Sequence, residues 1–346
     1  MKHPTICDAV LAGALATAGG CASDRRDAGD EGAAAQSGIS QGSDDGIDPS
    51  ATGNDDADVL DVGQVSGASA GDGGEGGDCP CENVLDGIYV LHSTDPPAVY
   101  FYDPPANTFT PVGQLGCVAE LGATANSMAI DRQGNATLNY YSLSGLQPSG
   151  RMYRAPLSNL TDCEDLGYHA QGAWFLLGMG YAVDGAGSSC DTLFVYDSDQ
   201  YTDYPDFAPG GSQLARWDDA TASTVPLGAT AYPVAELSGT GDARLFAFAT
   251  VASNQSVLVQ LDKSSGAELE STPLVGLDIT NAFAFAFWGG DVYFFTETSP
   301  GASTSKVTRL DYDGSDGGGL TVVNPDAGIH IAGAGVSTCA SFTPPA

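Results

Sequence analysis

The sequence predicts an all-β fold, a β-propeller of five four-stranded blades. Three observations predict it. Beyond residue 86, aromatic and β-branched residues recur in short alternating runs bounded by Gly, Pro, Asn and Asp, and no stretch shows the 3.6-residue period of a helix. A strand-and-turn phrase repeats at the spacing of propeller blades, and runs of alternating small and apolar residues recur with it. Six blades is the alternative, because the long segment containing residues 197–207 has room for another blade.

Residues 1–21 have the elements of an export signal: a basic start, an apolar stretch (Ala9–Ala18) too short to span a bilayer, and a small-residue exit. Cys21 resembles the lipobox cysteine of bacterial lipoproteins, which is lipidated and becomes the new N-terminus, although Ala18 replaces the usual Leu or Val. We therefore expect a lipoprotein of the cell envelope or outer membrane. A plain signal peptide cleaved near Ala22, giving a secreted protein, is the alternative.

Residues 22–78 form an acidic spacer with fourteen acids, two bases and no aromatic residue. Such a segment buries too little apolar surface to offset the entropy of ordering, so we expect it to be disordered and extended by self-repulsion. The folded domain is then predicted to be 79–346.

The repeated phrase is a strand that ends in a turn aspartate. It ends at Asp103, Asp218, Asp262 and Asp311, and a weaker copy ends at Ala155. Successive anchors lie 52, 63, 44 and 49 residues apart, within the range of kelch-type blades. Each aspartate is expected to accept hydrogen bonds from amides of the turn that follows it, which makes these residues structural.

Small and apolar residues alternate in three segments, 127–131, 178–184 and 282–287, as expected of inner strands near a crowded axis. The predicted blades are 126–175, 176–232, 233–280 and 281–325. Residues 87–125 hold only three strands, and residues 329–337 repeat the small and apolar alternation. We therefore predict that the C-terminal strand completes the first blade, which removes exposed sheet edges.

The strand, turn aspartate and threonine-rich outer strand of residues 98–113 resemble the NHL/kelch-like propellers of secreted bacterial proteins. With the lipobox-like end, the acidic spacer and the closing residues 332–339, the chain is similar to a group of uncharacterised myxobacterial lipoproteins. The resemblance implies a fold and a location at the cell envelope. It implies no particular chemistry.

Six cysteines follow the spacer, an even number that predicts disulfides in an exported chain: Cys79, Cys81, Cys117, Cys163, Cys190 and Cys339. Fifteen connectivities are possible. Closure of the first blade places Cys339 near Cys79 or Cys81, and Cys117 with Cys163 is a second candidate pair. Zinc binding by Cys79 and Cys81 is disfavoured, because no second pair lies at zinc-site spacing.

The formal net charge of −33, from 44 acids against 11 Lys and Arg, excludes binding of nucleic acid or anionic lipid through charge. Membrane contact is expected only through the lipid anchor. No metal or cofactor is expected, with calcium as the weaker alternative. Residues 311–317 look like the start of a calcium loop, but Asp316 replaces the turn glycine and Val322 the bidentate glutamate, so we expect a hairpin turn.

Catalytic motifs are sparse, and we expect a non-enzymatic protein that binds a protein or glycan partner through loops on one face. Its candidate recognition surface is the set of aromatic residues Tyr196, Tyr201, Tyr204 and Trp217. The alternative is a secreted hydrolase, a glycosidase or cation-dependent lactonase. The candidate catalytic residues are then Asp131 and Asp184, which end comparable inner strands, and His330, with Glu236 or Asn281 as neighbours at a channel mouth.

Overall fold

The structure is a computed structural model that describes residues 79–144, 148–170, 174–198, 212–251, 255–277, 283–297 and 304–343. All of them belong to the second of the chain's two compact units, Asp72–Ala346. These residues form twenty β-strands and no helix, and therefore include no helix that could cross a membrane. The export signal, Cys21 and residues 22–78 lie outside the described part of the chain.

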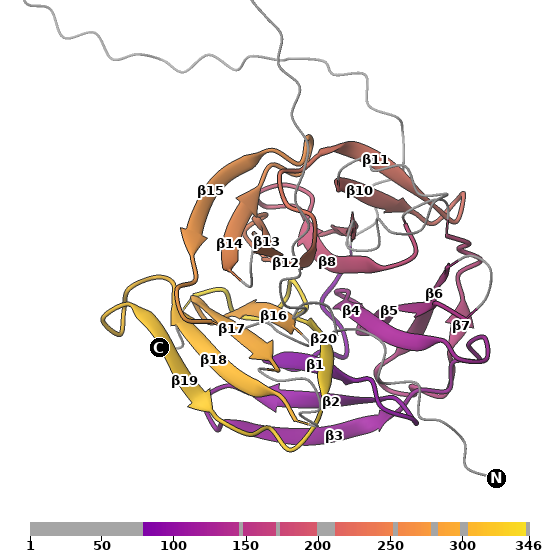
Figure 1. Cartoon of the computed structure of the whole chain (residues 1–346), viewed down its shortest axis with the longest axis horizontal. Helices are drawn as coiled ribbons and strands as arrows, with labels where there is room; N and C mark the ends of the chain where they lie inside the picture. Colours follow the sequence, from indigo (N-terminus) through magenta and orange to yellow (C-terminus); the bar gives the residue numbers. More distant parts are fainter. Residues whose placement is uncertain are drawn as a thin grey trace, which may run out of the picture. The chain divides into compact units, whose positions relative to one another are not determined.

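The strands pair into five four-stranded antiparallel sheets arranged as the blades of a propeller (Figure 1). In order from the inner to the outer strand, blade 1 contains β20 (Ile331–Gly335), β1 (Ile88–His92), β2 (Ala98–Asp103) and β3 (Thr108–Gln114). In the same order, blade 2 contains β4 (Thr124–Ile130), β5 (Asn135–Ser142), β6 (Ser149–Pro156) and β7 (Glu164–Asp165). Blade 3 contains β8 (Leu177–Val183), β9 (Asp191–Asp197), β10 (Gln213–Asp218) and β11 (Ser223–Ala229). Blade 4 contains β12 (Ala235–Gly239), β13 (Leu245–Thr250), β14 (Ser256–Leu261) and β15 (Glu268–Pro273). Blade 5 contains β16 (Phe283–Trp288), β17 (Asp291–Thr296), β18 (Lys306–Asp311) and β19 (Gly319–Asn324).

The predicted five-bladed propeller is confirmed, and so is its closure by the C-terminus. Strand β20 pairs antiparallel with β1, with Val90 opposite Ala334 and Leu91 opposite Gly333. Five sheets account for every strand among the described residues, so they do not contain the sixth blade that was the alternative.

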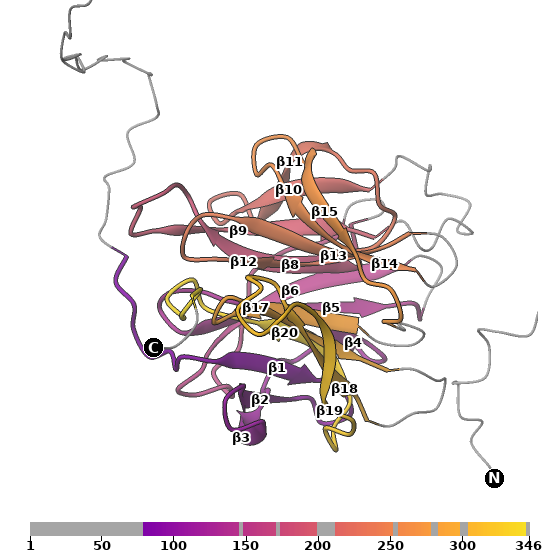
Figure 2. The same cartoon turned by 90° about the vertical axis from the view of Figure 1, so that its left-hand side faces the viewer.

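The inner strands β4, β8, β12, β16 and β20 surround the propeller axis and run in the same direction (Figures 1 and 2). We call the face where they begin the upper face and the face where they end the lower face. Neighbouring inner strands approach backbone to backbone. A Cβ atom on Gly178 would lie 2.1 Å from the carbonyl oxygen of Ala235, and one on Gly239 would lie 2.1 Å from that of Tyr181. The small residues are therefore required by this close approach.

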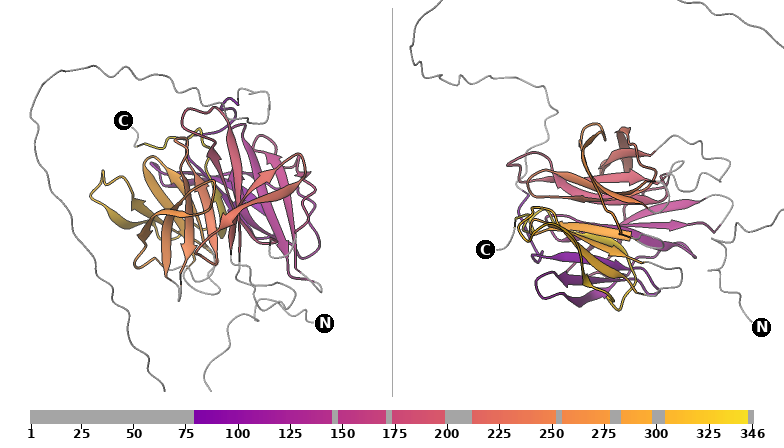
Figure 3. Two further views of the ribbon diagram at one scale, coloured as in Figure 1. Left: turned by 90° about the horizontal axis from the view of Figure 1, so that it is seen from above. Right: turned by 60° about the vertical axis from the view of Figure 1, so that its left-hand side comes forward.

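The core lies between adjacent blades, because side chains on a strand point alternately to its two faces. On β13, Phe246 and Phe248 pack against blade 5, whereas Leu245 and Ala247 pack against blade 3. The Phe246 ring stacks on Phe287 of blade 5 with centroids 5.3 Å apart. Figure 3 shows these twisted sheets from two further sides.

The four turn aspartates have the role predicted for them. Asp103 accepts a hydrogen bond from the Ala106 amide (3.1 Å), and Asp218, Asp262 and Asp311 accept equivalent bonds from amides of their own turns. The hairpin turn expected after residue 311 is also present, between β18 and β19.

Three disulfides join the six cysteines: Cys79 to Cys190, Cys81 to Cys339, and Cys117 to Cys163. The second links the segment before β1 to the segment after β20, as expected from closure of the first blade. The third is the other pair that the sequence indicates, whereas the Cys79–Cys190 bond emerges only from the structure.

Replacement of Gly178 by Ala tests the close approach of the inner strands. The new Cβ would lie 2.1 Å from a backbone carbonyl oxygen of the neighbouring inner strand, so the free energy of unfolding should fall by about 2 kcal/mol or more. Gly185→Ala is the matched control, because a Cβ there meets nothing within 4 Å, and it should change stability by less than about 1 kcal/mol. Chemical denaturation measures both values, and equal stabilities would contradict the close packing of the inner strands.

Candidate functional site

The lower face is covered by the two ends of the propeller domain. The segment after β20 places Thr338 among the turns of several blades: Arg132 of blade 2 donates to its hydroxyl oxygen (3.3 Å), and that hydroxyl donates to Asp191 of blade 3 (2.9 Å). Gly241 of blade 4 lies so close that a Cβ on it would be 2.5 Å from the Thr338 carbonyl oxygen. Ser341 contacts blade 5 by accepting a bond from the Gly289 amide. The C-terminal segment therefore crosses the axis on this face.

Residues 79–86 reinforce this cover. The Arg132 side chain donates to the carbonyl oxygen of Cys79 (3.0 Å), and the Arg132 carbonyl oxygen accepts a hydrogen bond from the Glu82 amide (2.8 Å). Asp86 accepts bonds from the Trp288 indole and from the amide and hydroxyl of Ser341. Two disulfides staple the same region.

Asp131 and Asp184, the candidate catalytic pair, both lie on this covered lower face. Asp131 is buried and accepts bonds from the backbone and side-chain amides of Asn135 (2.7 and 2.8 Å). Asp184 is exposed and accepts a bond from the Thr192 hydroxyl (2.6 Å). Both carboxylates therefore have partners within their own hairpin turns, the arrangement that favours a structural role.

Asp191, a carboxylate that the sequence did not single out, lies between them. Burial raises its pKa to about 6, and the neighbouring Asp131 and Asp184 carboxylates add to the rise, while the bond from Thr338 opposes it. Asp131, Asp184 and Asp191 therefore influence one another's charge on the lower face.

The upper face carries a different group of residues, which we call the histidine cluster: His92, Glu297 and His330. His330 directly precedes the inner strand β20, and its Nδ1 bonds to the carboxylate of Glu297, which is 1% exposed. His92, at the end of β1, places Nδ1 2.8 Å from the His330 carbonyl oxygen and Nε2 2.6 Å from Thr94 Oγ1. The buried carboxylate orients the His330 ring, which remains partly exposed.

A cavity of about 380 Å³ adjoins this cluster. It is lined by His92, Thr94, Asp95, Tyr100 and Gln114, among others. Its volume falls in the usual range of small-molecule sites, about 300–1,000 Å³. The lining combines the ring-bearing residues His92 and Tyr100 with the exposed residues Thr94, Asp95 and Gln114, so it offers both apolar contact and hydrogen-bonding groups to a polar ligand.

Glu236 also belongs to the upper half of the inner-strand ring, as the second residue of β12. It is buried and accepts a bond from the Ser127 hydroxyl of blade 2 (2.7 Å). Burial raises the pKa of Glu236 well above its usual range, which favours the neutral carboxyl group. The structure therefore places Glu236 and His330 toward one face and Asp131 and Asp184 at the other, and it does not bring the four together. Asn281 lies outside the described residues.

The two described members of the aromatic candidate surface lie in the core. Tyr196 is fully buried and its hydroxyl donates to the Tyr232 carbonyl oxygen (2.6 Å). Trp217 is 6% exposed and donates to Asp219 (2.8 Å). Packing of blade 3 against its neighbours therefore accounts for both. Tyr201 and Tyr204 lie outside the described residues.

No protein-family model and no curated protein matches the chain. Solved structures do resemble it. TolB from Acinetobacter baumannii shares 14% identity over 72% of this chain and 54% of that chain, with a TM-score of 0.40. A glycosyl hydrolase from Bacteroides ovatus shares 11% identity over 72% and 85% of the two chains (TM-score 0.42). The β-propeller domain of the trilobed protease from Pyrococcus furiosus shares 8% identity over 59% and 58% (TM-score 0.32).

The resemblance concerns the fold, and this chain spans about half the length of the Acinetobacter TolB. Identities of 8–14% carry nothing about activity. The class of protein that the fold defines is a five-bladed, disulfide-linked β-propeller.

Replacement of Asp191 by Asn should alter how stability depends on pH. The folded carboxyl group keeps its proton up to about pH 6, whereas the unfolded one loses it near 3.8, so ionisation of Asp191 lowers the free energy of unfolding as pH rises through this window. The variant lacks this loss and should gain roughly 1–3 kcal/mol relative to the wild type between pH 4 and pH 8.

Chemical denaturation at pH 4, 5, 6 and 8 measures the difference. Glu270→Gln, which removes an exposed carboxylate, controls for the change in net charge. Parallel pH profiles of the Asp191→Asn variant and the wild type would contradict the raised pKa.

Proposed function

We propose that this protein is an exported propeller, held at the cell envelope by a lipid anchor, that binds a glycan at the upper face beside the histidine cluster. The observation that carries the proposal is the cavity of about 380 Å³ beside the histidine cluster. The terminal segments, which cross the lower face, leave this cavity uncovered, and its lining includes the ring-bearing residues His92 and Tyr100 and the polar residues Thr94, Asp95 and Gln114.

The chemistry of the cavity favours a sugar over other small ligands. Tyr100 and His92 are among its lining residues, and their ring centroids lie 6.0 Å apart in an edge arrangement. Asp95 and Gln114 are exposed and supply acceptor and donor groups for hydroxyls. The net negative charge of the chain disfavours polyanionic partners, so neutral or cationic sugars are the expected ligands.

A panel of immobilised neutral and amino-sugar oligosaccharides tests this proposal with the full mature chain. At least one should bind saturably, and Gln114→Ala and Asp95→Ala should each weaken that binding by about tenfold, the cost of one lost polar contact. The matched control is Gln255→Ala, an equally exposed glutamine that lines another cavity in blade 4. Absence of binding to every sugar, or equal losses for Gln114→Ala and Gln255→Ala, would contradict the glycan assignment.

A hydrolase is the second candidate, and one observation favours it. Toward the upper face lie Glu236, whose pKa is raised well above its usual range by burial, and His330, whose ring bonds to the Glu297 carboxylate, so a carboxyl group and an imidazole are available for acid–base catalysis. The proposed hydrolase site therefore lies on the upper face, whereas Asp131 and Asp184, the catalytic candidates from the sequence, lie on the lower face. Incubation of a bound oligosaccharide with the protein separates the two functions, because a binding protein releases it intact.

Export and anchoring are proposed from the first 21 residues, and the three disulfides are compatible with an oxidising compartment. Mass spectrometry of the mature N-terminus should find a diacylglyceryl group and an N-acyl chain on Cys21. Cys21→Ser should shift the protein from the membrane fraction to the soluble fraction, because one such anchor supplies the membrane affinity. An unmodified N-terminus at or after Ala22 in the wild type would disprove the anchor.

A further inference from the structure

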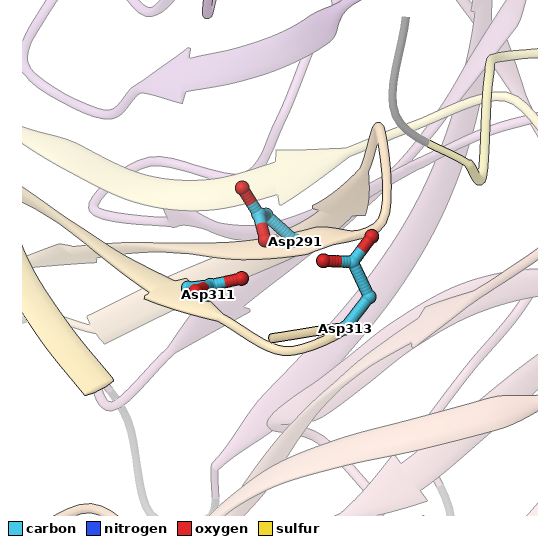
Figure 4. A group of neighbouring side chains, drawn as sticks. All are labelled: Asp291, Asp311 and Asp313. Atoms are coloured by element: carbon cyan, nitrogen blue, oxygen red, sulfur yellow. The ribbon is translucent and has the colours of Figure 1, made fainter. Parts of the chain in front are cut away.

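Blade 5 carries a cluster of three carboxylates that lies on the lower side of the propeller, away from the histidine cluster. Asp291 begins β17, Asp311 ends β18, and Asp313 follows in the turn before β19. Because Val292 pairs with Leu310, the antiparallel register brings Asp291 beside Asp311. One oxygen from each of the three side chains lies within 4.8 Å of the others (Figure 4).

Positive charge near the cluster is small. Arg309 Nη1 lies 3.3 Å from Asp291 Oδ2, and the same nitrogen donates to Asp316 (2.8 Å). The Tyr312 amide donates to Asp291 Oδ1 (3.2 Å), and the Ser315 amide to Asp313 Oδ1 (2.9 Å). Among the described residues, Arg309 is the arginine that pairs with this cluster, through Asp291, and it is shared with Asp316, which lies outside the cluster.

Asp311 provides an independent observation that points to a ligand. The residue is 6% exposed, and its Oδ2 accepts bonds from the amides of Asp316 and Gly318. Its Oδ1 is buried and accepts no hydrogen bond from any described residue. A buried carboxylate oxygen without a partner is costly, and native proteins rarely retain one without a reason. Figure 4 shows this carboxyl group turned toward Asp291 and Asp313.

We propose that Asp291, Asp311 and Asp313 form a binding site for a divalent cation of the calcium class. Calcium binds oxygen ligands at 2.3–2.6 Å, so two ligands on opposite sides of the ion lie up to about 5 Å apart, which the observed 4.8 Å limit satisfies. Three carboxylates favour calcium over magnesium, which is usually held by one or two carboxylates and keeps several waters. The ion supplies the missing partner of Asp311 Oδ1.

This site differs from a one-loop calcium motif. Residues 311–317 supply Asp311 and Asp313 from one hairpin turn, and the third carboxylate comes from the separate turn that joins β16 to β17. Bound calcium therefore links two hairpins of blade 5. One of them includes Gly289, whose amide bonds to the C-terminal segment at Ser341. Calcium is thus expected to stabilise the blade next to the ring closure.

Calorimetric titration of calcium into the metal-free full chain tests the proposal, with terbium luminescence as a second readout. Trp288 pairs with Asp291, and Tyr312 lies between Asp311 and Asp313, so excitation of these residues should sensitise a bound terbium ion. The wild type should bind one calcium ion saturably, with a Kd in the millimolar range or below, as extracellular modules do. Calcium should also raise its Tm.

Three variants make the test specific. Asp313→Asn changes an exposed residue that the fold tolerates, and it should weaken binding at least tenfold; Asp311→Asn should abolish the binding and the terbium signal. Asp326→Asn is the matched control, an exposed aspartate of the same blade that accepts a turn amide outside the cluster, and it should bind like the wild type. Equal calcium binding by the wild type and Asp313→Asn would assign the ion to the acidic spacer and overturn the site. Absence of saturable binding at 5 mM calcium would overturn it as well.

Discussion

The pairing of β20 with β1 is the interaction on which the rest of this structure depends. It joins residues about 240 positions apart in the chain, completes blade 1 and leaves no blade without its inner strand. It also sends the C-terminal segment across the lower face, where Thr338 bonds to Arg132 and Asp191. The Cys81–Cys339 disulfide fixes the same closure covalently. The covering of one face is therefore a consequence of how the ring is closed.

The acidity of the domain divides into groups with different physical roles. Turn aspartates such as Asp103 and Asp262 accept backbone amides, so their charge belongs to the construction of the blades. Burying an acid is costlier, and the buried Glu236 and Glu297 each have a side-chain partner: Glu236 accepts a bond from Ser127, and Glu297 bonds to His330. Asp311 is different because one of its oxygens is buried without a partner. The net charge of the chain does not distinguish these roles of its acidic residues.

The two candidate sites lie at different places and rest on different chemistry. The histidine cluster and its cavity are on the upper face, between the first blade and the end of β17, and combine ring-bearing residues with carboxylate, amide and hydroxyl groups. The carboxylate cluster is on the lower side of blade 5 and contains hard oxygen ligands only. A ligand at the first site and a cation at the second can therefore be studied separately, and neither needs the other to form.

The sequence by itself determined the blade repeat, the turn aspartates and the closing strand, because each follows from local alternation, turn chemistry or the position of an element along the ring. It also indicated Cys117 with Cys163 as a pair, but it left open whether Cys339 pairs with Cys79 or with Cys81. Tertiary structure alone decided which polar side chains meet. Asp131 and His330 both flank inner strands, but one follows its strand and the other precedes it, so they lie on opposite faces. Asp291 joins Asp311 only through the register of β17 and β18, and His92 meets His330 only through closure of the ring. These side-chain contacts depend on long-range strand pairing, which cannot be read from the pattern of residues adjacent in the sequence.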